Sequence, residues 1–275
     1  MNRIVTDLPA EAYFKAEGLS GSLLVEGARS MKRAKWYVDN PKEETPAMRW
    51  GNLQHPALLE PDRFESELVV FEGKSKRGSA WTEFVAENQG KYCVTEEESE
   101  LLAAAMDSIR SRPDAMALLT EGDREASAFW ETTVYGKAKG RMDVYDVNHI
   151  VDLKTTGDLD NFKNVAARML YHVKMGWYQI GAREITGKLL PVYIVAVEQD
   201  PPFDVRVFEY DSEALAIGRD IAINTAKKYR ACQQSGVYPG ACEDVQTLRL
   251  PEWMIKQHME KIDVESIEPM EAKDL

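Results

Sequence analysis

Cysteine is scarce in this sequence, and its scarcity limits the chemistry that the protein can carry. The 275 residues include only three cysteines, Cys93, Cys232 and Cys242, which are odd in number and far apart. Reduced thiols are therefore the default, as in cytosolic proteins. An iron–sulfur cluster needs four thiolate ligands, so we expect no such cluster in this chain.

Long hydrophobic runs are also absent from the sequence. No apolar stretch approaches the roughly 20 residues that cross a bilayer, and residues 1–9 lack the hydrophobic region of a signal peptide. We therefore expect a cytoplasmic protein with no membrane partner.

Positively charged residues are also few. The sequence has 34 lysines and arginines against 46 aspartates and glutamates, which gives a net charge of −12. DNA binding relies on Lys and Arg side chains that neutralise phosphates, so an acidic chain that binds DNA must concentrate its cations locally. Lys137, Lys139 and Arg141 alternate with small residues, and the two-residue period of a strand would put them on one face. The sequence thus predicts a short basic stripe, with an ordinary solvated strand face as the alternative.

Length and hydrophobic content favour one large α/β domain. With 44% hydrophobic residues, a chain of this length can bury a full core. We expect a helical and loop-rich part over residues 1–62, the core that carries the functional site over 63–263, and a flexible acidic tail over 264–275.

Hydrophobic periodicity and capping residues predict the individual elements. Thr95 and Glu98 form a capping-box pattern, which begins a helix that ends near Ile109. Short helical stretches are expected over residues 22–37. Further helices are expected over 113–119, from 158 or 160 to 185, and from 212 to about 236. Strands are expected over residues 68–71 (followed by a loop to residue 90), 126–135, 137–145, 149–154, 191–198 and 205–210.

Two acids and a lysine fall at the end of a predicted hairpin. If residues 147–148 form its two-residue turn, paired positions add up to 295 and Asp143 lies directly opposite Asp152. Directly paired residues share a face, with Cβ atoms roughly 4.5–5.5 Å apart, and Lys154, two residues beyond Asp152, shares that face too. Two like charges so close together require a cation or a proton, which predicts a divalent-metal site rather than a solvated surface.

Asp143 followed by Asp152-Leu153-Lys154 is one of several motifs that occur together in a known family. The others, in chain order, are Tyr13 to Ser22, Gly51 to His55, Leu59 to Pro61, Glu125 to Trp130, Gly140 to Asp143, Val151 to Thr156 and Tyr171 to Tyr178. In this order and spacing they resemble the PD-(D/E)XK nuclease superfamily, and within it the phage and prophage exonucleases of the RecE (exonuclease VIII) type. The resemblance covers most of the chain.

The resemblance implies a fold and a chemistry. The fold would be a restriction-endonuclease-like α/β core, with a central mixed sheet flanked by helices. The activity would be Mg²⁺-dependent hydrolysis of DNA, with Mn²⁺ as a substitute, and most specifically 5′→3′ exonuclease digestion of linear double-stranded DNA. The metal ligands would be Asp143, Asp152, the backbone carbonyl of Leu153, Glu125 and His55, with Lys154 as the residue that orients the attacking water.

Two of these assignments have alternatives. Glu131 is the rival of Glu125 for the upstream acid. His55 could be a structural histidine, and because Pro56 fits only the first turn of a helix, we expect His55 at a helix start.

The segment from Tyr171 to Tyr178 resembles the Gln-x-x-x-Tyr element of RecB-like nucleases, which contacts DNA. Lys174 stands where glutamine is usual, and Tyr178 follows one helical turn later. The expected DNA contacts are therefore Lys137, Lys139, Arg141, Lys174 and Tyr178. An aromatic cluster such as Tyr171, Trp177 and Tyr178 is more often core packing than base stacking.

The same resemblance implies partners, namely the ends of double-stranded DNA, a single-strand annealing protein and identical subunits in a ring. The location would be the cytoplasm of a bacterial host. Two alternatives stay open, a structure-specific endonuclease of the same fold and a catalytically silent module that binds DNA ends or acts as a decoy. The presence of Asp143, Asp152 and Lys154 together argues against the silent module.

The net charge of −12 generates a prediction about assembly. We expect a closed homo-oligomer with an acidic exterior and its basic stripe along the DNA path, because the local potential, not the net charge, steers DNA. Sedimentation velocity at working concentration should show one species larger than the monomer. A monomer that degrades long duplexes processively would contradict this expectation.

Overall fold

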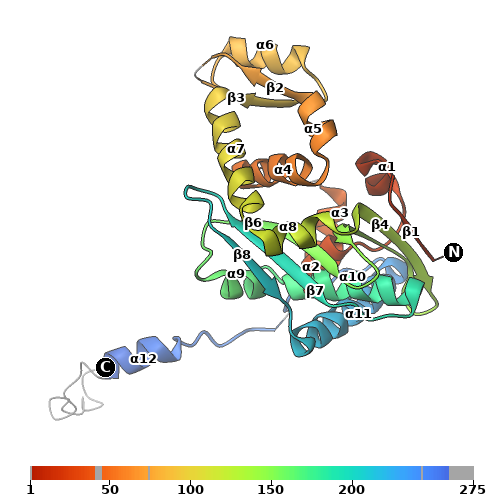
Figure 1. Cartoon of the computed structure of the whole chain (residues 1–275). Coiled ribbons are helices and arrows are strands. Elements are labelled where there is room, and N and C mark those ends of the chain that lie inside the picture. Colours follow the sequence, from red (N-terminus) through yellow and green to blue (C-terminus); the bar gives the residue numbers. More distant parts are fainter. Residues whose placement is uncertain (1, 41–44, 74, 243, 260–275) are drawn as a thin grey trace. The chain divides into compact units, whose positions relative to one another are not determined.

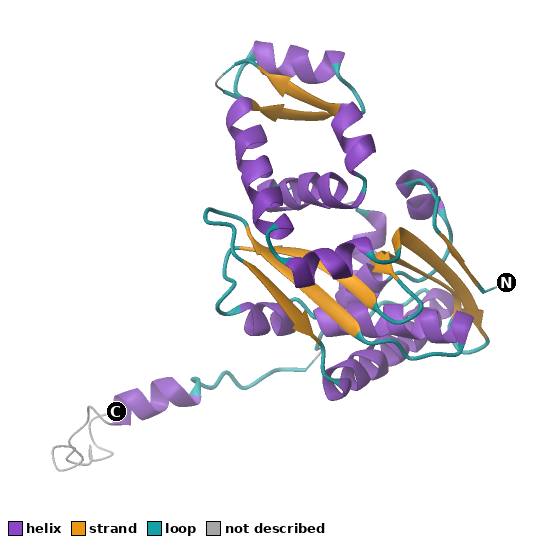
Figure 2. Cartoon of the chain, viewed as in Figure 1, coloured by secondary structure: helices purple, strands orange, loops and turns teal. Residues whose placement is uncertain are grey.

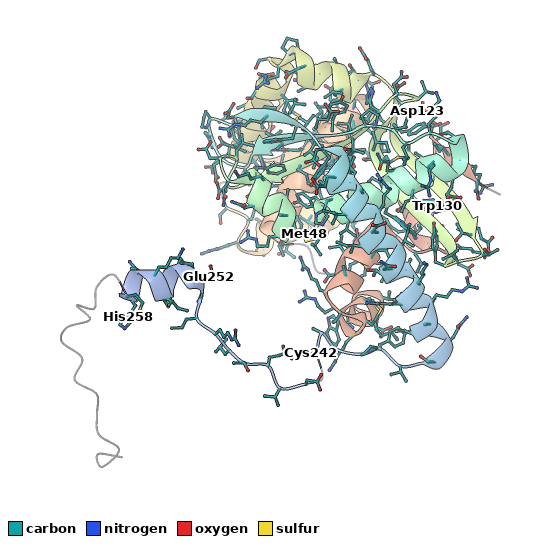
Figure 3. All side chains as sticks on the ribbon, turned by 90° about the horizontal axis from the view of Figure 1, so that it is seen from below. Met48, Asp123, Trp130, Cys242, Glu252 and His258 are labelled. Atoms are coloured by element: carbon teal, nitrogen blue, oxygen red, sulfur yellow. The ribbon has the colours of Figure 1, made fainter. Side chains whose placement is uncertain are left out.

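The computed structural model describes the chain except for residues 1, 41–44, 74, 243 and 260–275. It divides into two units, residues 1–241 and 242–275. The described part of the second unit contains α12 (Glu252–Met259), labelled in Figure 1 and drawn with its side chains in Figure 3. The predicted acidic tail over 264–275 lies outside the described residues, and the predicted domain division stays a prediction. None of the described helices is long and apolar enough to span a membrane.

A six-stranded mixed sheet forms the centre of the first unit (Figure 1, Figure 2). Its strands, in spatial order, are β1 (Arg3–Val5), β4 (Asp123–Thr132), β5 (Gly136–Tyr145), β6 (Ile150–Thr156), β7 (Val192–Glu198) and β8 (Val205–Glu209). Neighbouring strands are antiparallel except β6 and β7, which run parallel. The predicted mixed sheet is confirmed, and within this sheet β1 is the strand that the sequence pattern did not reveal.

Helices cover both faces of this sheet and bury separate cores. One face buries the first core against α2 (Gly21–Arg29), α3 (Met31–Asp39), α10 (Tyr171–Thr186) and α11 (Ser212–Ser235). The opposite face buries the second core against α4 (Pro46–Leu59), α7 (Glu96–Arg110) and α8 (Pro113–Thr120). A smaller cluster joins α9 (Phe162–Arg168) to the strand β7. The sheet is therefore flanked by helices, as predicted.

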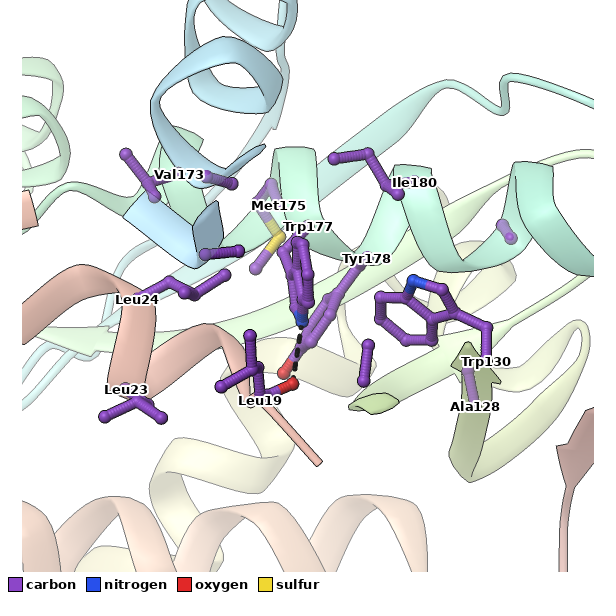
Figure 4. Close-up of a cluster of buried hydrophobic side chains, with 14 of the residues drawn as sticks. Leu19, Leu23, Leu24, Ala128, Trp130, Val173, Met175, Trp177, Tyr178 and Ile180 are labelled. Carbon is purple, nitrogen blue, oxygen red and sulfur yellow. Dashed lines mark hydrogen bonds between the residues drawn. The ribbon is translucent and has the colours of Figure 1, made fainter. Parts of the chain in front are cut away.

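Trp177 of α10 contacts several other segments within the first core (Figure 4). Its indole N–H donates to the carbonyls of Leu19 (3.2 Å) and Lys139 (3.1 Å). Its ring centroid lies 4.9 Å from that of Trp130 on β4. The side chain is fully buried, so the expectation that this aromatic residue serves core packing is confirmed.

A separate small layer lies between α4 and α7 in the chain. It consists of α5 (Pro61–Glu67), β2 (Leu68–Phe71), α6 (Ser79–Glu87) and β3 (Tyr92–Thr95), and β2 pairs with β3 in parallel. Trp81 and Phe84 of α6 pack on Phe71 of β2, with ring centroids 5.3 and 5.1 Å apart. The loop predicted up to residue 90 is thus wrong over residues 79–87, because these aromatic contacts make a polar segment helical.

Two predicted helical segments each contain two helices. The helical stretches expected over residues 22–37 are α2 and α3, which are divided at Ser30, whose hydroxyl accepts from the backbone N–H of Arg33 (3.1 Å) and caps α3. The helix expected to reach residue 185 breaks at Leu170 (φ +56°), between α9 and α10. The apolar periodicity continues across the break at Leu170, which is why the pattern did not reveal it. The remaining predicted helices, including the one with the capping box, are confirmed.

The helices α10 and α11 cross at two glycines. A Cβ on Gly218 would lie 2.0 Å from the carbonyl oxygen of His172, and one on Gly176 would lie 2.6 Å from the backbone nitrogen of Arg219. The two backbones therefore contact each other directly, and neither glycine can carry a side chain unless the helices move apart.

Gly218→Ala should destabilise the protein by about 1–3 kcal/mol, the usual cost of overpacking. Gly240→Ala is the matched control, because a Cβ there meets no atom within 4 Å, and its effect should stay within about 0.5 kcal/mol. Urea unfolding followed by circular dichroism measures both variants. Equal stabilities would contradict the direct helix contact.

Candidate active site

The β5–β6 hairpin has the predicted pairing. Val144 pairs with Val151 and Tyr145 with Ile150, so that paired positions add up to 295. The two-residue turn at residues 147–148 is therefore confirmed.

The strands separate directly beyond Val144 and Val151, at Asp143. The predicted pairing of Asp143 with Asp152 is wrong, because the ladder ends one residue earlier. In its place, the Asp143 carboxylate accepts a hydrogen bond from the backbone N–H of Leu153 (2.7 Å). A side-chain oxygen thus satisfies a buried N–H while it holds the two strands apart.

Glu125 lies beside Asp143 on the neighbouring strand β4. The residues on either side of Glu125 pair regularly with β5, but Glu125 itself interrupts the ladder with a left-handed backbone (φ +52°). Such a backbone is uncommon outside glycine and costs of the order of 1–3 kcal/mol. The Glu125 side chain lines the same cleft as Asp143, whereas the rival Glu131 is exposed near the other end of β4.

His55 completes a group of three candidate metal ligands. One ligand atom from each of His55, Glu125 and Asp143 lies within 4.8 Å of the others, and Nδ1 of His55 is 3.6 Å from Oδ2 of Asp143. The three residues come from α4, β4 and β5. One imidazole and two carboxylates suit a hard divalent cation such as Mg²⁺ or Mn²⁺.

His55 lies inside α4, so its predicted position at a helix start is wrong. The helix already begins at Pro46, and Pro56 is in its interior. An interior proline removes a backbone hydrogen bond and costs about 3 kcal/mol. Leu53 and Ala57 on the same helix are buried in the second core, and this packing keeps the helix continuous through the proline.

Asp152 is fully buried and forms ion pairs with two lysines. Its carboxylate contacts Nζ of Lys154, and its Oδ1 lies 3.3 Å from Nζ of Lys174. Burial raises the pKa of Asp152, but the two ammonium groups outweigh burial and lower that pKa to about 2. Asp152 lies outside the three-residue group formed by His55, Glu125 and Asp143, and its role as a metal ligand stays a prediction.

The ammonium of Lys154 lies among groups that were predicted to bind the metal. Besides its contact with Asp152, it donates to the carbonyl of Leu153 (3.0 Å), and it lies 5.4 Å from the ring centroid of Tyr171. The Asp152 carboxylate and the Leu153 carbonyl therefore face one positive charge together, as two oxygens of a cation site would.

Lys174 and Tyr178 line the cleft and contact groups within the protein. Burial lowers the pKa of Lys174, but the charge of Asp152 outweighs it and raises that pKa well above its ordinary value. Nζ of Lys174 lies 5.3 Å from the Tyr178 ring centroid, and the buried Tyr178 ring packs against the backbone of Gly140. Lys174 thus supports Asp152 on β6, and Tyr178 packs on β5. The contact of both residues with DNA stays a prediction.

The residues of the basic stripe follow β5, but each has a partner within the protein. Lys137 is exposed and pairs with Glu17 (2.6 Å). Lys139 is buried and donates to three backbone carbonyls in residues 13–16. Arg141 forms an ion pair with the ligand candidate Glu125. Their contact with DNA likewise stays a prediction.

The charges of the three candidate metal ligands, His55, Glu125 and Asp143, are not balanced locally. Burial raises the pKa of Glu125, the neighbouring Asp143 raises it further, and Arg141 acts in the opposite direction without cancelling the rise. Glu125 has Arg141 as its basic partner, while Asp143 faces His55 and the Leu153 N–H. A divalent cation between the two carboxylates would relieve their repulsion, so the donor set fits such an ion.

One cleft with a volume of about 810 Å³ is lined by the three candidate ligands and by Lys154 and Lys174. Its walls also carry side chains to which the motifs assigned no role, namely Tyr13, Phe14, Met48, Tyr92, Met169 and Gln199. Tyr13 and Phe14 stand in a motif of the family resemblance, but the other four have no local sequence signal. They reach the cleft only because helices and strands from distant parts of the chain pack around it.

Comparison with known proteins adds independent support for the fold. Residues 22–251 match the family described as a PDDEXK-like domain of unknown function (DUF3799). No curated protein matches the sequence. A crystal structure from Eubacterium rectale, of a protein provisionally named an exonuclease, has a TM-score of 0.63 and 17% identity, with 91% of this chain and 98% of that chain covered.

A phage-related exonuclease from Haemophilus somnus 129PT is similar at a TM-score of 0.36 and 14% identity, with 81% of this chain and 97% of that chain covered. The family match spans most of the sequence and includes every acid and lysine of the cleft. This chain therefore belongs to the PDDEXK-like family, and the superfamily that the motifs predicted is confirmed.

Proposed function

We propose that this protein is a divalent-metal-dependent DNA exonuclease. The observation that carries the proposal is the group of His55, Glu125 and Asp143, whose ligand atoms lie within 4.8 Å of one another, in the same cleft as Lys154. Carboxylate and carbonyl oxygens without a thiolate favour Mg²⁺, with Mn²⁺ as a substitute. A bound Mg²⁺ would polarise the scissile phosphate and lower the pKa of a water molecule.

The side chains of the cleft have separate tasks in this reaction. His55, Glu125 and Asp143 would hold the cation, and Asp152 and the Leu153 carbonyl would be its further ligands. Lys154 supplies a fixed positive charge, which stabilises the negative charge that develops on the phosphate in the transition state. Lys174 holds Asp152 from the other side, so the carboxylate and the lysine that it contacts are both in place before DNA arrives.

The substrate and the direction of digestion come from the family resemblance. Exonucleases of the RecE type digest linear duplex DNA from 5′ to 3′ and leave a 3′ single strand for an annealing protein. We extend this activity, its role in phage-type recombination and the ring assembly to this chain. The E. rectale protein of similar fold, provisionally named an exonuclease, supports an exonuclease over the endonuclease alternative.

Lys154→Ala should reduce DNA cleavage by roughly a hundred- to a thousand-fold, the usual loss when a charged contact to the transition state is removed. The variant should stay folded, because Asp152 keeps Lys174 as a partner, and circular dichroism checks this. Lys188→Ala is the matched control, since Lys188 is exposed and does not line the cleft. Equal cleavage rates for the two variants would rule out the assignment of Lys154.

Cleavage should require Mg²⁺ or Mn²⁺ and stop in excess EDTA. Ca²⁺ should support DNA binding without cleavage, because its larger and looser coordination misplaces the attacking water. End-labelled linear duplexes should lose their 5′ nucleotides first, and covalently closed circles should stay intact. Cleavage of closed circles would favour the endonuclease, and binding of ends without cleavage in Mg²⁺ would favour the silent module.

A further inference from the structure

Phe14 is a largely exposed aromatic side chain in the wall of the cleft. It lies on α1 (Ala10–Lys15), is 73% exposed and lines the same cleft as Asp143. Met48 and Met169 line that cleft too and are 41% and 43% exposed. Exposed apolar side chains occur singly on most protein surfaces, so exposure by itself assigns no function to Phe14.

The backbone that carries Phe14 is held by a buried lysine. Nζ of Lys139, on β5, donates to the carbonyls of Tyr13 (3.0 Å), Phe14 (3.1 Å) and Ala16 (2.7 Å). These bonds use all three donors of the ammonium group and reach backbone carbonyls at the C-terminal end of α1. Burying a charged group is costly unless it is fully hydrogen-bonded, and here the whole bonding capacity of one lysine fixes the position of α1.

Tyr13 and Arg141 give α1 a second support. The Tyr13 ring is buried, with Nζ of Lys139 4.9 Å and Cζ of Arg141 5.8 Å from its centroid. The Phe14 ring packs edge-on against Tyr13, with centroids 5.5 Å apart. Arg141 also pairs with Glu125. Arg141 therefore contacts both Tyr13, against which Phe14 packs, and Glu125, an acid of the proposed metal site.

We propose that Phe14 stacks on the terminal nucleobase of a DNA strand that enters the cleft, and that it thereby sets the position of the strand end relative to the acids. The inference rests on the proposed function and names a contact within it. An aromatic ring can stack on any base, because every base has a π face. Met48 and Met169 suit bases of different shape, because their side chains are flexible and polarizable. The ligand is thus a nucleobase without sequence preference.

Phe14 and the basic stripe contribute to DNA binding in different ways. Contacts to phosphates weaken as salt rises, because they depend on the release of counterions, whereas stacking on a neutral ring releases none. Lys139 donates all its N–H groups to α1, so it acts on DNA through the position of Phe14. An acidic protein thereby gains a part of its DNA affinity that does not depend on salt.

Fluorescence of a duplex with 2-aminopurine at its 5′ end, titrated in Ca²⁺ at several salt concentrations, tests the proposal. Phe14→Ala should weaken binding about 5- to 150-fold and leave the slope of log K against log salt unchanged, because no phosphate contact is lost. Phe14→Trp should restore the affinity. Trp36→Ala is the matched control, since Trp36 is 68% exposed on α3 and does not line the cleft, and it should bind like the unaltered protein.

The titration separates the possible outcomes. Unchanged affinity of the Phe14→Ala variant, a changed salt slope, or no binding of DNA ends by the unaltered protein would each overturn the proposal. Because binding is measured without cleavage, Phe14-dependent binding by a protein that cuts no DNA in Mg²⁺ would refute the nuclease and leave this inference standing. Cleavage with binding that does not depend on Phe14 would do the reverse.

Discussion

The geometry of the cleft depends on the hydrogen bond from the backbone N–H of Leu153 to the carboxylate of Asp143. Up to Val144 and Val151 the strands β5 and β6 form a regular ladder, and beyond them the ladder stops. A buried N–H must find an acceptor, so the strands can part at this point only because a side chain supplies one. The same carboxylate faces His55 and Glu125, so one interaction both separates the strands and presents the acid.

Buried charge organises the surroundings of this bond. Asp152 lies between Lys154 and Lys174, and Glu125 pairs with Arg141. Lys139 donates to carbonyls alone. A buried ion is costly when it is unpaired and tolerable when it is paired and hydrogen-bonded. In a chain with a net charge of −12, this arrangement holds several cations beside the cleft, where the fold fixes them in place.

Local patterns predicted the parts of the structure that local interactions decide. The β5–β6 turn follows from its short polar sequence, and the turn sets which residues pair. The capping box at Thr95 and the long helix α11 follow from short-range signals in the same way. Prediction failed where packing outweighs a local preference. Pro56 disfavours a helix interior, yet α4 continues through it because Leu53 and Ala57 are buried against the second core.

The sequence by itself determined the chemistry of the site, since the spacing of Asp143, Asp152 and Lys154 brings two acids and a lysine to adjacent strands. Only the tertiary structure decided what each charge contacts. Lys139 and Lys174, which the pattern indicates as DNA contacts, turn to acceptors within the protein. Strand and helix periods determine the face on which a side chain lies. What covers that face comes from distant segments such as α1 and α10, and their packing decides whether a charge meets solvent, a carbonyl or a carboxylate.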